Sequence, residues 1–193
     1  MVEISPLSRE HEEPATGILA RAYVTNPLHI VAFGSGNLDT NAAFFRAGLS
    51  KMKGRKLVAT DGGRVVGVAH WASSPACRYS VLEKLGVMPA LLRGCGLRSA
   101  LRVATWLSTW AAHDPDELHT HLGPIAVDPE SQGRGIGTRL MGAHCRELDR
   151  EGAMGFLETD RLRNVEFYER FGFRTTETDT TLGVETFFMR RGG

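Results

Sequence analysis

Three glycines fall within the five positions from Gly133 to Gly137, directly ahead of a stretch with helical periodicity. The first turn of a helix presents backbone N–H groups that have no partner within the helix, together with about half a positive charge. Glycines before that turn lack the Cβ atoms that would keep a phosphate at a distance. The run QGRGIGT, from Gln132 to Thr138, is therefore suited to bind the diphosphate of a cofactor through its main chain.

Two common phosphate-binding patterns fit this run less well. A P-loop requires a lysine directly after its glycines, and none follows here. A dinucleotide-binding fold requires GxGxxG directly after a strand and an acidic residue about 20 residues further on. Glu158 and Asp160 lie at a suitable distance, but the third glycine of that pattern would fall on Thr138 or Leu140. The dinucleotide interpretation therefore ranks second.

Two motifs in a fixed order support a third interpretation. The segment LGPIAVDPESQGRGIGTRLM resembles the central motif of the GNAT superfamily of acetyl-CoA-dependent acetyltransferases, with Q-x-x-G-x-G at Gln132, Gly135 and Gly137. Further on, FLETDRLRNVEFYERFGF resembles the second motif of that superfamily and is similar to the branch that contains puromycin N-acetyltransferase. Together the two motifs span residues 118–175. A motif match of this kind predicts a strand, a loop and a helix in fixed positions, and the structure can test that prediction.

The resemblance implies that acetyl-CoA is the cofactor and assigns it a binding site. In the superfamily the diphosphate lies on the loop amides, and the pantetheine arm pairs with the main chain of the preceding strand. The positions assigned to the cofactor in this way are Ile125, Ala126, Val127, Gln132, Gly133, Arg134, Gly135, Ile136, Gly137, Thr138 and Asn164. Pro124, within that strand, has no N–H for a ladder, so a bulge or a release from the neighbouring strand is expected there.

Acetyl transfer to an amine needs an unprotonated amine, a donor for the developing oxyanion and a proton for the departing thiolate. The resemblance implies that Tyr168 supplies this proton. Asn164 lies four residues earlier and hence on the same face of the helix. As alternatives, Tyr168 is a packed helix residue, since Phe167 and Phe171 lie nearby, and Asn164 is the helix cap.

The general base stays open at the level of the sequence. His119 and His121 point to the same side of a strand, and an imidazole with a pKa of about 6.5 accepts a proton at neutral pH. Glu158, on an adjacent buried strand, could instead bind or deprotonate the amine, directly or through water. Equally, the histidines could be a solvated strand end and the glutamate a structural hydrogen-bond partner. A metal at the two histidines is not expected, because no third ligand stands out nearby in the sequence.

The elements that must position these residues follow from the periodicity. Strands are predicted at 2–7, 57–60, 65–71, 118–127, 154–157, 173–178 and 184–190, and helices at 10–23, 37–51, 81–112, 138–150 and 164–171. Pro89 and Gly94–Gly96 should interrupt the third helix. The pattern predicts one α/β domain over 1–193, with a mixed sheet and helices on both faces. The resemblance implies that this sheet is mostly antiparallel and twisted. The resemblance adds that the sheet splays open between its two central strands.

The composition argues against several classes of protein. Lysine and arginine number 23 against 22 acidic residues, so the basic surplus typical of nucleic-acid binders is missing. The three cysteines form no CxxC pair, and the polar amino terminus does not resemble a secretory signal. The most apolar tract, 91–112, contains three arginines, so no membrane span is expected. We expect a cytoplasmic protein, and a homodimer is left open.

The sequence thus predicts an N-acetyltransferase that transfers the acetyl group of acetyl-CoA directly to the primary amine of a small molecule in a ternary complex. Residues 75–115 exceed what a minimal acetyltransferase needs. They could wall the acceptor site with Trp106 and Trp110, although such a pair is often core or a subunit contact. The region that commonly admits the acceptor contains Tyr23, His29 and Phe33. The rival predictions are a non-catalytic acyl-CoA sensor and a dinucleotide-dependent oxidoreductase.

Overall fold

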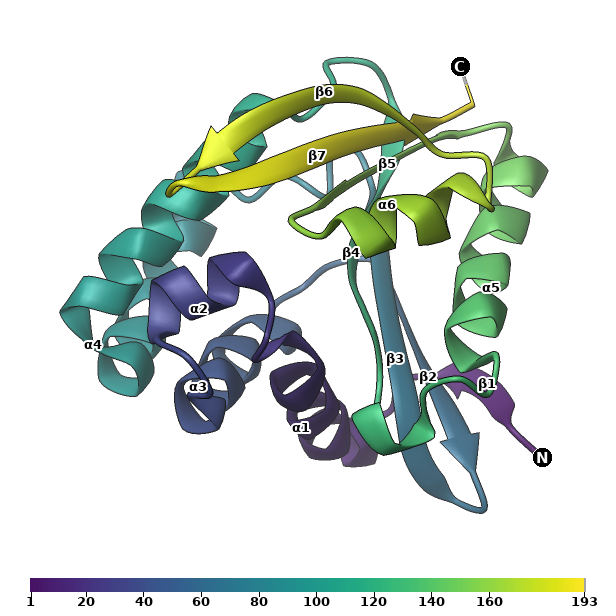
Figure 1. Cartoon of the computed structure of the whole chain (residues 1–193), viewed down its shortest axis with the longest axis horizontal. Helices are drawn as coiled ribbons and strands as arrows, with labels where there is room; N and C mark the ends of the chain where they lie inside the picture. The colour runs from purple at the N-terminus through teal and green to yellow at the C-terminus, as the bar shows by residue number, and fades with distance from the viewer. Residues whose placement is uncertain (193) are drawn as a thin grey trace.

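The computed structural model describes residues 1–192 and is built around a seven-stranded sheet (Figure 1). The strand order is β1-β2-β3-β4-β5-β7-β6, and all neighbours are antiparallel except β4 and β5. The strands are β1 (Glu3–Pro6), β2 (Arg55–Asp61), β3 (Arg64–Ser73), β4 (His119–Val127), β5 (Met154–Thr159), β6 (Arg174–Thr181) and β7 (Val184–Arg191). This sheet confirms the predicted fold class, and it is not the open parallel sheet that a dinucleotide-binding fold requires.

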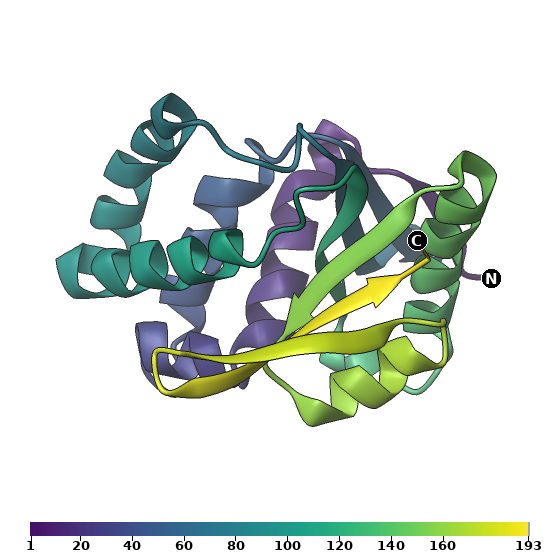
Figure 2. The same ribbon diagram turned by 90° about the horizontal axis from the view of Figure 1, so that it is seen from above.

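Helices cover both faces of the sheet, as Figures 1 and 2 show. The helices are α1 (Glu12–Tyr23), α2 (Pro27–Phe33), α3 (Leu38–Leu49), α4 (Val81–Ala112), α5 (Ile136–Glu151) and α6 (Leu162–Glu169), with 3-10 turns at Arg9–His11 and Pro129–Ser131. α5 and α6 lie on one face, and α1 to α4 lie on the other. α2 is missing from the sequence-based prediction, because a helix of seven residues is too short to show a clear period.

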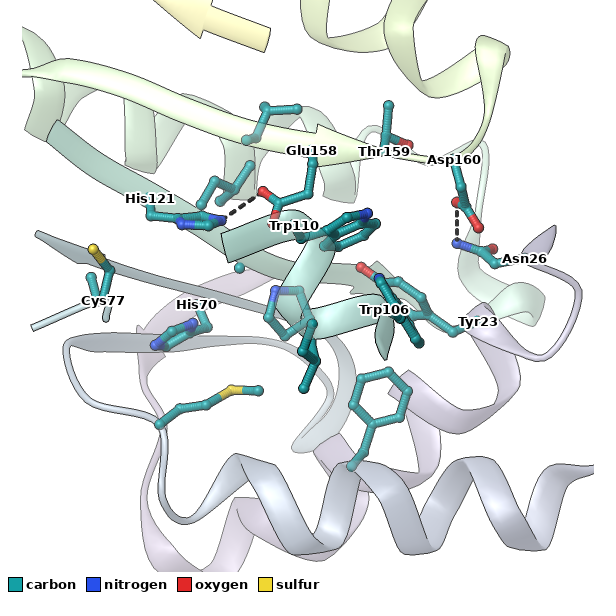
Figure 3. A pocket seen from close by; sticks show the side chains of 18 of the residues that line it. Tyr23, Asn26, His70, Cys77, Trp106, Trp110, His121, Glu158, Thr159 and Asp160 are labelled. Carbon is teal, nitrogen blue, oxygen red and sulfur yellow. Dashed lines mark hydrogen bonds and ion pairs between the residues drawn. The ribbon is translucent and has the colours of Figure 1, made fainter. Parts of the chain in front are cut away.

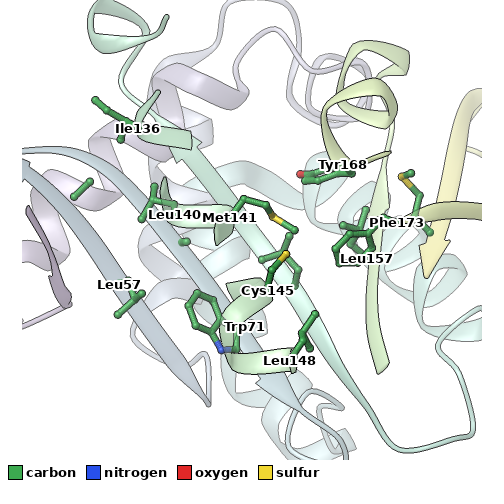
Figure 4. Packing of buried hydrophobic residues seen from close by; sticks show 14 of the residues in the cluster. Leu57, Trp71, Ile136, Leu140, Met141, Cys145, Leu148, Leu157, Tyr168 and Phe173 are labelled. Carbon is green, nitrogen blue, oxygen red and sulfur yellow. The ribbon is translucent and has the colours of Figure 1, made fainter. Parts of the chain in front are cut away.

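Separate apolar clusters hold the two helical layers to the sheet. The predicted apolar face of α5 is confirmed, and Figure 4 shows it packed beside Trp71 of β3. The buried residues of that face are Leu140, Met141, Cys145 and Leu148. On the opposite face, Ile18 of α1 and Phe45 of α3 pack against Val58 and Val68 of the sheet. The sheet is thus covered on both sides, which fixes the strand ends where the candidate site residues lie.

β4 and β5 separate after three paired positions. Their parallel ladder joins residues 119–121 to residues 154–156. On the opposite edge of β4, Gly123 and Pro124 together face the single residue His70 of β3, which is a β-bulge. The bulge and the splay between the central strands are therefore both confirmed. The part of β4 after residue 121 has one edge that faces the resulting gap.

α4 consists of two helical segments that meet at Gly96, where φ is 76° and ψ is 164°. The predicted break at the glycines is confirmed, but the predicted break at Pro89 is wrong, because Pro89 keeps a helical conformation. The second segment packs through Trp106 against Leu28 and Phe33 of α2. In the described part of the chain, 1–192, no helix combines the length and apolar character that a membrane crossing needs.

Candidate active site

The glycine loop and the start of α5 open onto a first pocket. Gly133 and Gly135 have φ values of 77° and 75°, a region that favours glycine, and Gly135 is the N-cap of α5. A Cβ atom at either glycine would meet no described atom within 4 Å, so the space ahead of the loop is open to a ligand. The predicted cofactor residues that line this pocket are Ile125, Ala126, Val127, Gln132, Gly133, Gly135, Ile136, Gly137, Thr138 and Asn164. Arg161, Arg163 and Arg170 add positive charge, as a phosphate site requires.

The remaining predicted cofactor residue points elsewhere. The Arg134 side chain donates from Nη2 to Asp61 Oδ2 at 2.6 Å, on the hairpin that joins β2 and β3. Only the main chain of Arg134 can therefore serve a ligand in the first pocket. The side chain of Ile136 is likewise committed to the apolar core, so its contribution is also limited to its main chain.

The free edge of β4 presents the main-chain groups of alternate residues to the gap. The Tyr23 hydroxyl lies 3.3 Å from both the N and the O of Ile125. Gln132 Nε2 donates to Val127 O at 3.3 Å. Because successive residues of a strand point their main-chain groups to opposite edges, those of Ala126 face β3 instead. From the sequence, Tyr23 was predicted only to lie in the region that admits the acceptor, and its contact with β4 carries no sequence signal.

A second pocket of about 220 Å³ lies beside the first, next to β4, β5 and α4 (Figure 3). Its walls are mostly aromatic and apolar, and include Tyr23, Phe44, Phe45, Met52, Trp106, Leu107, Trp110, Leu122 and Leu157. Its acidic groups include Glu158 and Asp160. The residues that border both pockets are Tyr23, Asn26, Asn164 and Tyr168. Ligands in the two pockets would meet at these four residues.

Tyr168 of α6 is only 7% exposed, although it borders both pockets. Its ring lies at the margin of the apolar cluster, near Leu157 and Phe173 (Figure 4). Burial raises its pKa well above the ordinary value of 10, and the nearby Tyr23 and Glu158 raise it further. The hydroxyl is therefore protonated at every physiological pH and can act as a hydrogen-bond donor. Tyr168 is both a packed helix residue and a residue of the site.

Asn164 is the third residue of α6, and the N-cap of this helix is Arg161. The predicted helix start at residue 164, and the interpretation of Asn164 as a cap, are therefore wrong. Asn164 Nδ2 instead donates to Thr159 Oγ1 at 3.1 Å, which ties α6 to the end of β5. This bond holds the asparagine on the border between the two pockets.

His121 of β4 and Glu158 of β5 meet at the start of the gap (Figure 3). His121 Nε2 lies 2.6 Å from Glu158 Oε2, and Nδ1 lies 3.3 Å from Asp114 Oδ1. Burial alone would lower the pKa of His121, but the charge of Glu158 and the hydrogen bond to Asp114 raise it well above 6.5. Both ring nitrogens of His121 therefore face carboxylates, so neither is directed at a ligand in the second pocket.

His119 is almost fully buried and lies next to the second pocket rather than on its wall. Burial would lower its pKa, but hydrogen bonds to Asp114 and Cys77 outweigh this effect and raise it to about 9. Burial would raise the pKa of Asp114, but hydrogen bonds from the two histidines and from Arg78 hold it well below its usual range. Neither Asp114 nor Cys77 was predicted as a site residue, because both lie in the loops that flank α4, outside the two motifs.

Asp160 positions α2. Its Oδ2 accepts a hydrogen bond from Leu28 N at 2.8 Å, and its Oδ1 accepts one from Asn26 Nδ2 at 3.4 Å. Burial raises the pKa of this carboxyl group. The dinucleotide interpretation treated Asp160 as a candidate acidic residue for a ribose. The structure instead places it at the amino end of α2, where its charge is favourable.

The fold and the two adjoining pockets define a class of protein, and a family comparison agrees with them. The model of the acetyltransferase (GNAT) family matches residues 25–173. The chain therefore belongs to the GNAT acetyltransferase family, whose members use acetyl-CoA as the acetyl donor. The resemblance inferred from the two sequence motifs is confirmed at this level. The narrower similarity to the puromycin N-acetyltransferase branch stays a prediction.

Some relatives match part of this sequence, and others share its fold at low sequence identity. Mycothiol acetyltransferase of Streptomyces coelicolor is 32% identical over 80 residues, which is 40% of this chain and 26% of that protein. The chain thus spans about a quarter of that relative. A structure described as histone acetyltransferase HPA2 and related acetyltransferase, from Corynebacterium glutamicum, has a TM-score of 0.76 at 19% identity, covering 99% of this chain and 96% of that one. Drosophila melanogaster polyamine N acetyltransferase has a TM-score of 0.67 at 16% identity over the full length of both chains.

Proposed function

We propose that this protein is an acetyl-CoA-dependent N-acetyltransferase whose acceptor is the primary amine of a small molecule with an apolar body. The observation that carries the proposal is the meeting of two unlike pockets at Tyr168. One pocket has a helix N-terminus and arginines, and the other has aromatic walls and a carboxylate. Membership of the acetyltransferase family supports acetyl as the transferred group.

The first pocket suits acetyl-CoA, which supplies an activated thioester and a thiol leaving group. The main-chain amides from Gly133 to Thr138 would hold the diphosphate, and Arg163 and Arg170 would add positive charge. On the edge of β4, Ile125 and Val127 would offer their main-chain groups to the pantetheine arm. The pantetheine arm would then replace the present hydrogen bonds of Ile125 and Val127 to the side chains of Tyr23 and Gln132.

Glu158 is the proposed proton acceptor. Its side chain is 7% exposed and lies on the wall of the second pocket, while the His121 ring holds Oε2. The other oxygen is available to take a proton from the acceptor ammonium, directly or through one water. The nitrogen lone pair that is released attacks the thioester carbonyl and forms the C–N bond. The nitrogen then loses its second proton to solvent, and the tetrahedral intermediate collapses with cleavage of the C–S bond and departure of the thiolate. His121 acts here as a positioning residue for the glutamate.

Tyr168 is the proposed proton donor to the departing sulfur. Its raised pKa means that a full transfer is uphill, so the un-ionised hydroxyl first stabilises the developing thiolate by hydrogen bonding. The phenolate that results from transfer regains a proton from solvent. Because Tyr168 borders both pockets, this donor lies where the thioester and the amine would meet.

The second pocket describes the acceptor by its chemistry. Trp106 Nε1 and Trp110 Nε1 are buried and have no hydrogen-bond partner within residues 1–192. The surrounding walls are aromatic. An amine on an aromatic or branched aliphatic body that also carries a hydrogen-bond acceptor would match both features. That a protein of the same fold is named a polyamine N acetyltransferase supports an amine acceptor.

A thiol-release assay over a panel of amines tests the proposal. Purified protein and acetyl-CoA are combined with aryl-alkyl amines, branched aliphatic amines, linear polyamines and amino acids. We expect release of coenzyme A thiol with the apolar primary amines and mass-spectrometric detection of the N-acetyl product. If acetyl-CoA raises the melting temperature but no amine releases thiol, the sensor alternative replaces this proposal.

A further inference from the structure

Four side chains beside the second pocket form a cluster whose combination acetyl transfer does not require. Cys77, Asp114, His119 and His121 each offer one ligand atom, and these atoms lie within 4.8 Å of one another. They come from the loop between β3 and α4, the loop between α4 and β4, and the first residues of β4. The side chains of His119 and Asp114 are 0% and 8% exposed, whereas Cys77 is half-buried and His121 is 22% exposed, and these last two line the second pocket.

Two contacts within the cluster converge on a single ring nitrogen. His119 Nε2 lies 3.0 Å from Asp114 Oδ1 and 3.6 Å from Cys77 Sγ. One ring nitrogen carries either one proton or one lone pair, so it can serve both neighbours only through a shared, three-centre bond. Asp114 Oδ1 also lies 3.3 Å from His121 Nδ1. A cation among these atoms would be a partner to all four residues at once.

The spacing agrees with a tetrahedral zinc site. Zinc–nitrogen bonds of about 2.0 Å and zinc–sulfur bonds of about 2.3 Å place neighbouring ligand atoms about 3.3 to 3.6 Å apart. Three of the six distances between ligand atoms, 3.0, 3.3 and 3.6 Å, lie close to this range, and all six lie within 4.8 Å. One thiol, two imidazoles and one carboxylate form a donor set that suits zinc, whereas calcium and magnesium prefer oxygen ligands only.

In metal sites, the ligand atoms that do not face the metal are usually hydrogen-bonded to neighbouring groups, and three residues of this cluster show the same arrangement. His119 Nδ1 lies 2.8 Å from the Glu117 carbonyl oxygen, which leaves Nε2 to face the cluster. His121 Nε2 lies 2.6 Å from Glu158 Oε2, which leaves Nδ1 to face it. Arg78 Nε donates to Asp114 Oδ2 at 2.6 Å, which leaves Oδ1 to face it.

A cysteine nucleophile activated by histidine is the main rival interpretation of these groups. In such a site the carboxylate holds one ring nitrogen while the other nitrogen faces the thiol. Here Asp114 and Cys77 approach the same atom, His119 Nε2, and Nδ1 is bonded to a carbonyl group. The arrangement at His119 therefore fits convergence on a metal and does not fit a proton relay. His121 differs, because Glu158 holds its Nε2 while its Nδ1 faces Cys77 and Asp114, so the metal measurements below decide between the two interpretations.

We propose that Cys77, Asp114, His119 and His121 bind one zinc ion in a closed structural site. The site would tie the loops at both ends of α4 to the start of β4, and so fix the helix that walls the second pocket. It would stabilise the protein whether or not the protein transfers acetyl groups. The sequence conceals the site, because Cys77 lies 42 residues before His119.

Metal analysis of the purified protein is the first test. The protein is prepared without a histidine tag, incubated with zinc sulfate, freed of excess metal by gel filtration and analysed by inductively coupled plasma mass spectrometry. We expect one zinc per chain in the wild-type protein and a loss of most of this zinc in Cys77→Ser. The matched control is Cys95→Ser, a half-buried cysteine of α4 outside the cluster, which should keep its zinc.

Cobalt substitution tests the ligand assignment itself. Cobalt(II) in the wild-type protein should give a thiolate-to-metal charge-transfer band and the visible bands of a tetrahedral ion. Cys77→Ser should lose the charge-transfer band, and Cys95→Ser should retain it. A Cys77→Ser protein that keeps this band would overturn the assignment of Cys77 as a ligand.

Zinc-dependent stability completes the test. The melting temperature of the wild-type protein should fall in EDTA and recover with added zinc, while Cys77→Ser should respond to neither. A folded wild-type protein that holds no zinc after incubation and shows no zinc-dependent melting overturns the inference. These readouts need no acceptor, so their failure is distinguishable from failure of the thiol-release assay.

Discussion

The two halves of the candidate site are built from different parts of the chain. The donor half is drawn mainly from the continuous stretch 125–138 and from α6, and it presents main-chain groups. The acceptor half gathers side chains from α1, α2, α3, α4, β4 and β5. Every residue except proline has the same main-chain groups, whereas a side-chain pocket depends on which residues the fold brings together. Substitutions in the donor half should therefore change affinity, and those in the acceptor half should change the chemistry.

The largest effect on activity should come from Glu158→Gln, which tests whether a change in the acceptor half alters kcat and leaves cofactor affinity unchanged. Glutamine keeps the size of the side chain and an acceptor for His121 but cannot take a proton at neutral pH. We expect kcat to fall by about 100- to 1000-fold, with the dissociation constant of acetyl-CoA unchanged. Steady-state thiol release and calorimetry measure the two quantities. Glu166→Gln, an exposed position on α6, is the control, and full turnover in Glu158→Gln would remove the base assignment.

Tyr168→Phe tests the proposed proton donor, which lies where the donor half and the acceptor half meet. The phenylalanine ring preserves the packing near Phe173 but removes the proton donor. We expect kcat to fall by about 100-fold with little change in acetyl-CoA affinity. Tyr79→Phe, at the more exposed rim of the second pocket, should retain kcat. Equal losses in both variants would show that Tyr168 has no special role.

A buried histidine lies on each side of the sheet, and the pair offers a comparison through pH. Burial lowers the pKa of His144, behind the donor half, and of His29, beside the acceptor pocket, to about 4. The pKa of a histidine in the unfolded chain is about 6.5, so between pH 4 and pH 6.5 the unfolded chain binds more protons than the folded protein. Stability that is present above pH 6.5 is therefore lost as the pH falls toward 4, by about 1.4 kcal/mol per unit for each histidine.

Replacement of either histidine by phenylalanine should weaken this acid-induced loss, but the two variants should differ at pH 7.5. Neither nitrogen of His144 has a hydrogen-bond partner within residues 1–192, so His144→Phe should cost little there. His29→Phe leaves Asn41, which lies 2.6 Å from His29 Nδ1, without its partner and should destabilise the protein by about 1 to 3 kcal/mol. Urea unfolding at pH 7.5, 6 and 5 measures both effects. An unchanged pH dependence in His144→Phe would contradict the argument.

The smallest effect should come from the donor half, at Thr138 in the first turn of α5. Thr138→Asp places a negative charge where the helix dipole favours it, so the fold should not lose stability. The same charge repels a diphosphate, and we expect the acetyl-CoA dissociation constant to rise by about tenfold, or about 1.4 kcal/mol, with kcat retained. Thr138→Asn is the uncharged control of similar shape. Equal affinity in the two variants would place the diphosphate elsewhere.

Much of the donor half could be predicted from the sequence, because its determinants are local. The glycines ahead of α5, the apolar face of that helix and Gly152 at its end each act within a few residues. The bulge at Gly123 and Pro124 also follows from a local property, the missing N–H of proline. Predictions failed where tertiary contacts prevail over local preference. α6 starts earlier than its motif suggests, and α2 depends on Asp160, which is 132 residues away in the chain.

The amino-acid sequence by itself determined the family, the mixed sheet and the loop that suits a diphosphate, since periodicity and main-chain geometry are properties of neighbouring residues. Only the tertiary structure decided which side chains meet. It paired His121 with Glu158 across two strands, set the Tyr23 hydroxyl on the edge of β4, and brought Cys77 to Asp114 and two histidines. The reason is physical: a contact between distant residues depends on how whole elements pack, and no single segment contains that information.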